Sequence, residues 1–352
     1  MGELHFNNVS YSVVIRTLGN SGEKYKRLIG SIKSQVIQPE EIIVAIPNGY
    51  ELDYSLGSEI IVRAQKGMVS QRAEGINRAH SKNILVVDDD LEFGPNFVLE
   101  LDLFMNAHHL DCVLPMEGQC SSEHSETINL WYPLLKRIRS GFTGQMFQSC
   151  RKSDYLDVVT VTAGHKVFCK SNSLDECYYC QTGNFQCFYI NTIKAQNVHF
   201  ENELWLQQGS LSSYAAYDDP SFFFPFYLQG NTIAYSLRTR YIHLDSASGH
   251  TARTRVEEKS IRYFSIARNR TIFWYRFLFQ TSSTISRKVY TLLGGIYAFV
   301  NYSIYTMAIN LNPKYWKSIK ALWLGYNEAL NVILSKKLTP LGLSYEKRIN
   351  RK

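Results

Sequence analysis

Three consecutive carboxylates, Asp88, Asp89 and Asp90, directly follow the short apolar run 84–87 (ILVV). Such a run is typical of a strand buried on both faces of a parallel sheet, and ligands bind at the carboxyl edge of these sheets. Adjacent carboxylates repel unless a cation or hydrogen bonds compensate them, and Mg²⁺ takes carboxylate oxygens together with substrate phosphates. These residues therefore indicate either a metal and phosphate site or a solvated strand end that enters a turn at Gly94.

A second carboxylate pair, Asp218 and Asp219, precedes an apolar run that Gly230 closes. The run is predicted to be helical, with the pair at its N-terminus. An Asp at this place satisfies free amide groups of the first helical turn, so helix capping is one interpretation. A functional pair is the other.

The elements that must position these carboxylates alternate along the chain. The sequence predicts strands at 11–16, 40–46, 59–63, 84–87, 112–115, 232–237 and 241–244, a strand after the turn 182–184, and helices at 23–36 and 69–80. Strands alternating with helices indicate a Rossmann-like α/β sheet, for which a nucleotide is the natural ligand. The motifs GxGxxG and GxxxxGK[ST] are absent, which argues against hydride transfer and against P-loop ATPases and GTPases. Phosphate would then be held by a metal ion.

Composition and length indicate one catalytic domain with an appendage. The chain has 352 residues, of which 45% are apolar and 20% charged, so it is not a disordered chain. From Thr251 onward, 18 Lys and Arg stand against 4 Asp and Glu, a net of +14, whereas the residues before it carry a net of −7. Such a basic tail favours a polyanionic partner, either anionic lipid or nucleic acid, and no nucleic-acid motif accompanies the charge.

The start of the chain and its cysteines predict a cytosolic protein. The first residues, MGELHFNNVSYSVVIRT, lack a positive n-region, an apolar h-region and a cleavage site. All seven cysteines lie between Cys112 and Cys187, and in a reducing compartment we expect free thiols. One CxxC, formed by Cys177 and Cys180, is weak evidence for zinc because no second CxxC or His pair accompanies it.

The tail contains 25 residues without formal charge, 289–313. That length is sufficient to span a bilayer, but its Asn, Ser, Thr and Tyr residues make it only moderately apolar. The preceding RNRTIFWYRFLFQ mixes arginines (Arg268, Arg270 and Arg276) with aromatic residues, as an interfacial helix does. We therefore expect helices lying on the inner leaflet, with a single span or packing on the catalytic domain as the alternatives.

In order along the chain, the stretches VVIRT, PEEIIVAIP, KGMVSQRAEGINRA, ILVVDDD, QTGNFQCF, YDDPSFFFPFYLQGNTIAY, RYIHL, ARNRTIFWYRF and LGYNEAL resemble the family 2 glycosyltransferases of the GT-A fold. The resemblance is strongest to bacterial enzymes that build cell-surface polysaccharides, and it spans most of residues 11–331. It implies a mostly parallel central sheet flanked by helices. It also implies that the carboxylates after the fourth strand form the DxD element, which binds a divalent cation, Mn²⁺ or Mg²⁺, bridging the donor's diphosphate.

The resemblance also assigns roles to individual residues. It implies a metal site of Asp88, Asp90 and His243, and a nucleotide-sugar site of Arg16, Thr17, Arg72, Asn77, Asp88 and Asp89. It places Gly183, Asn184 and Trp205 at the acceptor and makes Asp219, with its neighbour Asp218, the general base of the family's ED motif. Two departures stand out: AIPNG replaces the usual VVDxxS after the second strand, and Pro220 follows the pair where another acidic residue is usual. The base of the nucleotide and the choice between Asp218 and Asp219 therefore stay open. For His243 the alternative is a packed, hydrogen-bonded core histidine, and for Trp205 it is ordinary core packing.

Together these features predict a catalytic domain at 8–250, with a nucleotide-sugar half at 8–115 and an acceptor half at 116–250, followed by a basic amphipathic helical region at 251–352. The expected reaction is transfer of a sugar, with inversion, from a nucleoside-diphosphate sugar to a hydroxyl of a growing, lipid-linked surface glycan. The expected location is cytoplasmic, on the inner face of the cell membrane. A sugar-phosphate nucleotidyltransferase and a non-catalytic membrane- or polyanion-binding protein are the alternatives.

Overall fold

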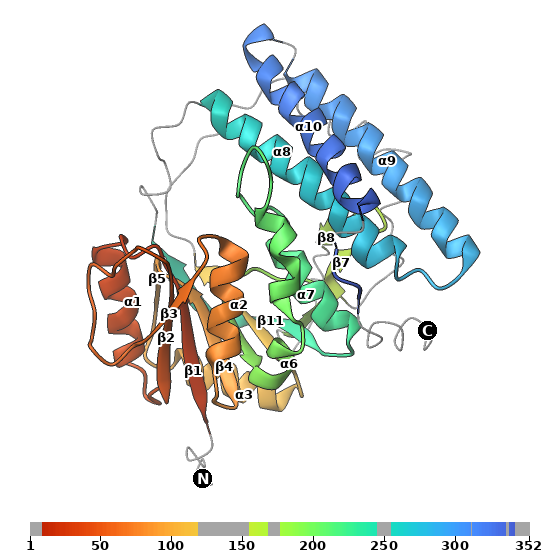
Figure 1. Ribbon diagram of the computed structural model, residues 1–352. Coiled ribbons are helices and arrows are strands. Elements are labelled where there is room, and N and C mark those ends of the chain that lie inside the picture. Colours follow the sequence, from red (N-terminus) through yellow and green to blue (C-terminus); the bar gives the residue numbers. More distant parts are fainter. Residues whose placement is uncertain are drawn as a thin grey trace. The chain divides into compact units, whose positions relative to one another are not determined.

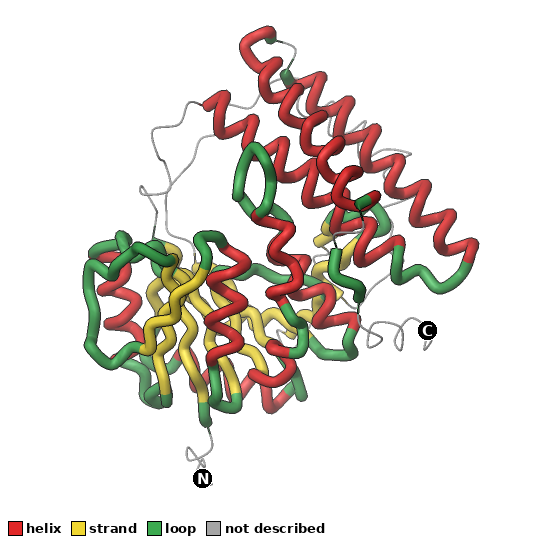
Figure 2. The backbone as a smooth tube through the Cα atoms, viewed as in Figure 1, coloured by secondary structure: helices red, strands yellow, loops and turns green. Residues whose placement is uncertain are grey.

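The computed structural model describes residues 9–118, 155–167, 177–244, 255–310, 312–335 and 338–341. Contacts divide the chain into two compact units, whose elements are shown in Figure 1 and Figure 2. The first comprises Met1–Cys120, Lys170–Leu204 and Gly230–Thr251, and the second comprises Ser121–Cys169, Trp205–Gln229 and Ala252–Lys352. This grouping differs from a division at residue 250, because the segment that carries Asp218 and Asp219 belongs with the C-terminal helices.

The first unit is built on a mixed sheet. Its strands run in the order β3-β2-β1-β4-β10-β6-β11-β9, and β5 pairs with β11. The strands are β1 (Tyr11–Arg16), β2 (Glu41–Pro47), β3 (Ile60–Ala64), β4 (Asn83–Asp88), β5 (Leu91–Phe93), β6 (Cys112–Gly118), β9 (Cys177–Cys180), β10 (Cys187–Asn191) and β11 (Ile233–His243). The predicted parallel arrangement holds from β3 to β4 and between β6 and β11, whereas β10 is antiparallel to both of its neighbours. The α/β class is confirmed.

Helices cover both faces of this sheet. They are α1 (Glu23–Lys33), α2 (Met68–Arg78), α3 (Phe97–Ala107) and the short α6 (Thr192–Gln196). Strand side chains alternate between faces, and Val13 and Ile15 of β1 pack into one buried cluster with apolar residues of α1 and α3. Val14 faces α2, which approaches so closely that a Cβ on Gly75 would lie 2.6 Å from Val14 Cγ1. Side chains at even positions of β1 and β4 share the face that α2 covers. The side chains of Arg16 and Asp88 therefore point toward α2.

Several features of the first unit differ from the sequence prediction, which did not include β9, α3 or α6. The strands expected at 232–237 and 241–244 form one long strand, β11, whose pairing with β6 shifts register between Ser236 and Arg240. The strand β5 was not predicted, and it pairs with the last residues of β11, including His243 opposite Leu91. A three-residue strand carries too little periodicity to be detected, yet this pairing brings β11 to the aspartate cluster.

The second unit is mainly helical. Its described elements are β7 (Tyr155–Val159), β8 (His165–Val167), α7 (Asp218–Leu228), α8 (Arg255–Phe273), the π-helix η4 (Trp274–Phe279), α9 (Ile285–Ile309), η5 (Pro313–Tyr315) and α10 (Trp316–Leu334), and the 3₁₀-helix η2 (Phe200–Gln207) enters it from the first unit. Strands β7 and β8 form an antiparallel pair. Helix α10 packs against α8 and α9, and Figure 1 shows it between them. A Cβ on Gly325 would lie 2.4 Å from Phe264 O, so this glycine permits α8 and α10 to touch.

The structure corrects the expected interfacial helix. Arg268 and Arg276 are each only 2% exposed, and Phe273 and Phe277 are completely buried. These side chains form the interior of the helical unit because arginine can be buried when hydrogen-bonded oxygens surround it. Exposed apolar side chains of this unit lie instead on α9 and α10.

Two further predictions concern membrane spanning and thiols. Among the described residues, none of the helices combines the length and the apolar character needed to cross a bilayer. Four cysteines lie in the described part of the chain, Cys112, Cys177, Cys180 and Cys187, and all four are free. Cys169, the remaining member of the possible zinc cluster, lies outside the described residues.

Candidate active site

The strand register places Arg16 and Asp88 side by side at the carboxyl edge of the sheet. They are direct partners in the parallel pair β1 and β4, and Arg16 Nε lies 3.1 Å from Asp88 Oδ1. Arg72 extends from α2 on the same face, with its Nη2 3.1 Å from Oδ1 and 3.3 Å from Oδ2 of Asp88. Two guanidinium groups therefore share one carboxylate.

The electrostatic balance of this group favours the ionised carboxylate. Burial by itself raises the pKa of Asp88, but the charges and hydrogen bonds of Arg16 and Arg72 outweigh it and hold the pKa below its usual value. Arg72 is itself 1% exposed, and its guanidinium carbon lies 4.4 Å from the centre of the Phe185 ring. This cation–π contact further fixes Arg72 beside Asp88.

Asp89 points to the other side of β4, toward the loop before α1. Its carboxylate accepts hydrogen bonds from the hydroxyls of Thr17 and, at 2.5 Å, Ser21. Burial raises the pKa of Asp89, although these hydroxyls act in the opposite direction. The hydroxyl of Thr17 in turn accepts a hydrogen bond from the Gly19 amide at 2.8 Å. The backbone φ of Gly19 is +83°, a conformation that favours glycine over other residues. Asp89 thus organises the loop that contains Arg16 and Thr17.

Asp90 faces His243. The end of β11 is fixed to the cluster because Leu244 N donates to Asp90 O at 2.8 Å. His243 Nε2 lies 3.3 Å from Asp90 Oδ2, and both side chains are partly exposed. The hydrogen bond to Asp90 raises the pKa of His243 above its usual value, with smaller contributions from Glu117 and Asp88, while burial acts in the opposite direction.

The donor set at this place fits a divalent cation. Mg²⁺ and Mn²⁺ bind through one or two carboxylates, imidazole in the case of Mn²⁺, together with substrate phosphates and water. Asp90 and His243 supply one oxygen and one nitrogen within contact of each other, and Asp88 lies nearby but is held by its two arginines. In the described part of the chain, no group of three or more His, Cys, Asp or Glu residues could hold a metal alone. A cation held by Asp90 and His243 would take its further ligands from a bound phosphate or water.

The loop before β10 also reaches this edge. Asp88 N donates to Gln186 O at 2.9 Å, and Tyr241 Oη donates to Gln186 Oε1 at 2.9 Å. Asn184 is tied to the same residue, since its Oδ1 accepts from Gln186 N at 2.9 Å. Asn184, predicted at the acceptor, is therefore linked through Gln186 to Asp88, and Gly183 precedes it in the same loop. Sequence reasoning did not single out Phe185 and Gln186, although they lie within the QTGNFQCF stretch that carried the resemblance.

Asn77 lies apart from this cluster. It is exposed in the last turn of α2, and its Nδ2 donates to Glu201 Oε2 at 3.3 Å. Helix α2 begins at the carboxyl edge of the sheet and runs toward the start of β4, so its final turn points away from Asp88. Donor binding by Asn77 therefore stays a prediction.

The second carboxylate pair begins α7 in the helical unit. The residue at the N-cap position is Tyr217, in the left-handed conformation with φ 74°, and its side chain makes no capping bond. Asp218 is buried at 7% exposure and Asp219 is half-buried. Both carboxylates lie in the first turn of α7, where they favour the helix dipole. Tyr214 belongs to the same neighbourhood, because burial and the charges of Asp218 and Asp219 raise its pKa.

Buried polar residues of α8 and α10 hold the segment that leads to α7. Asn269 Nδ2 donates to Leu206 O and to Ala216 O, both at 2.9 Å. Arg268 donates from Nη1 to Trp205 O and from Nε to Glu328 Oε1, both at 2.6 Å.

Glu328, on α10, also accepts from Ser210 N at 3.2 Å. Trp205, predicted at the acceptor, is buried at 6% exposure and belongs to this helical unit. We call Arg268, Asn269 and Glu328 the brace of the 205–216 segment.

Comparisons with known proteins add a structural likeness. No protein-family model and no curated protein sequence matches the chain. Among solved structures, the chain is similar to glycosyltransferases. One is S. aureus TarS 1-349, with a TM-score of 0.48 and 14% identity over 97% of this chain and 90% of that one. For the same fragment in complex with UDP-GlcNAc, the TM-score is 0.44 and the identity 14%, and the likeness covers 93% of this chain and 92% of that one.

A further similar structure is GalNAc-T7 with UDP, GalNAc and Mn²⁺. Its TM-score is 0.46 at 12% identity, and the likeness covers 86% of this chain and 58% of GalNAc-T7. At these scores the likeness assigns no activity by itself. Any functional conclusion rests on the geometry of this chain's own residues.

Proposed function

We propose that the protein is an inverting, divalent-cation-dependent glycosyltransferase that uses a nucleoside-diphosphate sugar. The observation that carries the proposal is the aspartate cluster at the carboxyl edge of the sheet. There Asp88 is neutralised by Arg16 and Arg72, and Asp90 lies against His243 in an open site. Such an edge is where α/β sheets bind nucleotides, and the combination of cationic side chains with an incomplete metal site suits a diphosphate.

Different residues have different roles in the proposed transfer. Arg16, which is partly exposed, would present its guanidinium group toward the donor phosphates, and the buried Arg72 keeps Asp88 in place. Asp90 with His243 would hold the cation. A divalent cation bound there supplies stabilisation of the negative charge that develops on the β-phosphate as the sugar leaves. Asp89 keeps the loop with Thr17 in place through its two hydroxyl contacts.

Asp219 is proposed as the general base. As the acceptor hydroxyl oxygen bonds to the anomeric carbon, its proton passes to the Asp219 carboxylate, and the bond between that carbon and the β-phosphate oxygen breaks. One displacement from the face opposite the leaving group inverts configuration. The half-buried Asp219 suits contact with an acceptor better than the buried Asp218.

We further propose a lipid-linked surface glycan as the acceptor and a peripheral location on the cytoplasmic face of the membrane. The support is an apolar stripe along α9, formed by Ile285, Val289, Leu292, Ile296, Val300 and Ile304, each at least 43% exposed. These positions repeat every three or four residues and so share one helix face. Arg287 and Lys288 are exposed beside its start. An apolar face next to basic residues suits an anionic bilayer surface.

Three measurements test these proposals. Isothermal titration of UDP, GDP and dTDP, each with and without Mn²⁺, is expected to show metal-dependent binding of at least one nucleotide. A donor screen should then release free nucleoside diphosphate by slow hydrolysis, whereas release of pyrophosphate would indicate a nucleotidyltransferase. Absence of any metal-dependent nucleotide binding would contradict the enzymatic proposal. For the membrane, Ile296→Asp with Ile304→Asp is expected to abolish sedimentation with anionic vesicles.

A further inference from the structure

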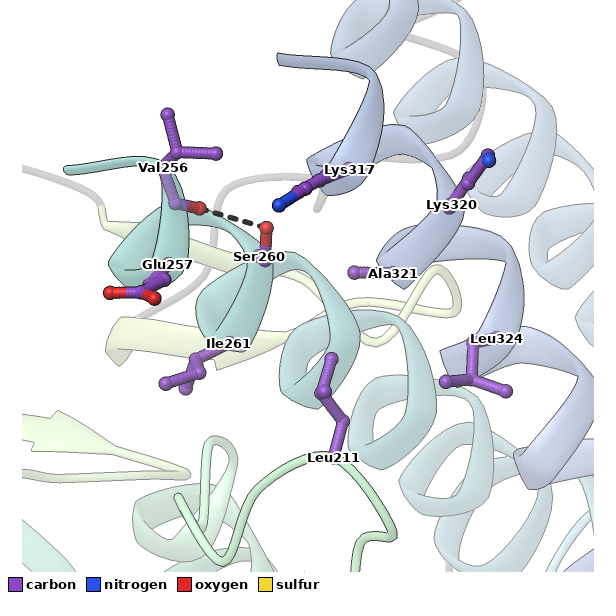
Figure 3. A pocket seen from close by; sticks show the side chains of 9 residues that line it. All are labelled: Leu211, Val256, Glu257, Ser260, Ile261, Lys317, Lys320, Ala321 and Leu324. Carbon is purple, nitrogen blue, oxygen red and sulfur yellow. Dashed lines mark hydrogen bonds between the residues drawn. The ribbon is translucent and has the colours of Figure 1, made fainter. Parts of the chain in front are cut away.

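A pocket of about 780 Å³ lies within the helical unit, between α8, α10 and the loop at Leu211 (Figure 3). Its lining consists of Leu211, Val256, Glu257, Ser260, Ile261, Lys317, Lys320, Ala321 and Leu324. The volume is within the range of small-molecule and cofactor sites. Nothing in the proposed glycosyl transfer uses it.

The lining has two chemical characters. Leu211, Ile261 and Leu324 provide an apolar wall from three separate segments, and Figure 3 shows them along one side of the pocket. Lys317 and Lys320 stand one helical turn apart on α10, and in Figure 3 the Lys317 ammonium group extends toward α8 beside Ser260. The pocket therefore combines a surface for hydrocarbon with two cations.

The two lysines are available to a ligand. Across the described ranges, neither Lys317 nor Lys320 forms an ion pair with a carboxylate, and both side chains are exposed. Ser260 Oγ donates to Val256 O at 2.8 Å and lies 3.2 Å from Ser318 Oγ, so its oxygen already has partners. Glu257 is the single acid of the lining, and it comes from α8, not from the helix that carries the lysines.

The charge of the surrounding chain indicates the sign of the occupant. Residues 257–328 contain ten Lys and Arg against three acids, Glu257, Glu258 and Glu328. A stretch with this net positive charge attracts anions. An occupant with an anionic head and a hydrocarbon chain satisfies both the charge and the apolar wall.

We propose that this pocket binds the phosphate headgroup and the first chain carbons of an anionic membrane lipid. Lys317 and Lys320 bind the phosphate oxygens through charge-assisted hydrogen bonds, and Leu211, Ile261 and Leu324 cover the chain. The inference rests on the proposed membrane contact of the same helical unit, whose exposed α9 stripe offers the route to lipid. Leu211 also belongs to the 205–216 segment held by the brace, so an occupant would touch the segment that leads to Asp218 and Asp219.

The test measures lipid binding without any sugar transfer. Dodecyl phosphate, below its micellar concentration, is titrated into the full chain by calorimetry, with dodecyl maltoside and inorganic phosphate as separate ligands. We expect dodecyl phosphate to bind more tightly than either. Lys317→Gln combined with Lys320→Gln should weaken it about tenfold, since each lost charge contact removes part of the affinity. Leu324→Asn should weaken it as well, and the matched double change Arg287→Gln and Lys288→Gln on α9 should leave it unchanged.

Three outcomes would overturn the inference: equal affinity for dodecyl maltoside, equal affinity for inorganic phosphate, or no effect of the double lysine change. Sedimentation with phosphatidylcholine vesicles, with or without phosphatidylglycerol, separates this inference from the membrane proposal. If the wild type binds anionic vesicles but the lysine variant keeps its affinity for dodecyl phosphate, the pocket proposal is wrong and the membrane proposal stands. If dodecyl phosphate binding depends on the lysines but the protein does not bind vesicles, the membrane proposal is wrong and the pocket proposal is supported.

Discussion

The two carboxylate clusters of this protein are held in different ways. In the first unit, Asp88 is paired with two arginines, Asp89 with two hydroxyls and Asp90 with a histidine. In the helical unit, Asp218 and Asp219 begin α7 after a residue in the left-handed conformation, and the preceding segment is held by the brace. The first cluster is compensated directly by contacts to its own side chains. The second is placed by hydrogen bonds to the backbone before it.

This difference has a functional consequence. Carboxylates that already have cationic or hydroxyl partners stay ionised or ordered and are suited to binding charge. A general base must keep a lone pair available to a substrate hydroxyl in a fixed position, and the brace fixes the backbone that leads to Asp218 and Asp219. We therefore expect substitutions in the first cluster to change donor and metal binding, and those in the second to change turnover.

The largest effect is expected from Asp219→Asn. This change preserves shape and much of the hydrogen bonding but removes the proton acceptor, so turnover should fall by roughly 10² to 10⁴ while donor affinity changes little. Asp218→Asn is the matched control and should cost less. If Asp219→Asn keeps near-normal turnover while Asp218→Asn is inactive, the general base is Asp218. If both retain turnover, the base lies elsewhere.

The next effect is expected from Asp90→Ala. Loss of this carboxylate should reduce metal-dependent turnover by roughly 10² to 10³, because it removes a group that stabilises developing charge. Asp90 is a cleaner test than Asp88, since removing Asp88 would leave the buried Arg72 without its counter-charge. Glu92→Gln, two residues further on, is the control and should have full activity. Unchanged turnover of Asp90→Ala, together with no effect of EDTA on the wild type, would contradict the metal site.

A smaller effect on turnover, with a large one on stability, is expected from Arg268→Met. The change leaves Glu328 and the carbonyl of Trp205 without their buried partner and should cost about 3–5 kcal/mol of unfolding free energy. Where the protein stays folded, turnover should fall by roughly 10- to 100-fold through misplacement of Asp219, with unaltered nucleotide affinity. Arg78→Gln, exposed in the last turn of α2, is the control. A loss of nucleotide affinity equal to that of turnover would show that the brace does not act on the second cluster specifically.

The smallest effect concerns pH and His243. Asp90 raises the pKa of His243, so its protonated form stabilises the fold fully below about pH 6.5, and this contribution is lost as pH rises through the folded value. A protonated imidazole cannot bind a metal, so Mn²⁺ affinity should rise with pH by up to about tenfold per unit across this range. His243→Gln should flatten that dependence in a titration of Mn²⁺ with UDP. An equally steep dependence in the variant would exclude His243 as a ligand.

Much of the first unit could be predicted from local pattern. The strands at 11–16 and 84–87 and the start of the helix at Glu23 agree with β1, β4 and α1, because continuous apolar runs and helical spacing are local signals. The prediction extended α1 to Val36, which is 57% exposed beyond the end of the helix. Apolar spacing alone does not mark a helix end without a cap residue.

The chain's sequence by itself determined that three aspartates would emerge at the carboxyl edge of an α/β sheet, because strand length and the order of elements fix that position. Only the tertiary structure decided which partner each aspartate has. Asp88 meets Arg72 because Gly75 lets α2 approach β1, and Asp90 meets His243 because a three-residue strand pairs with β11, which lies far along the chain. The arginines expected at a membrane are buried for the same reason: whether an amphipathic helix faces lipid or its neighbours depends on helices that pack against it, and α10 covers α8.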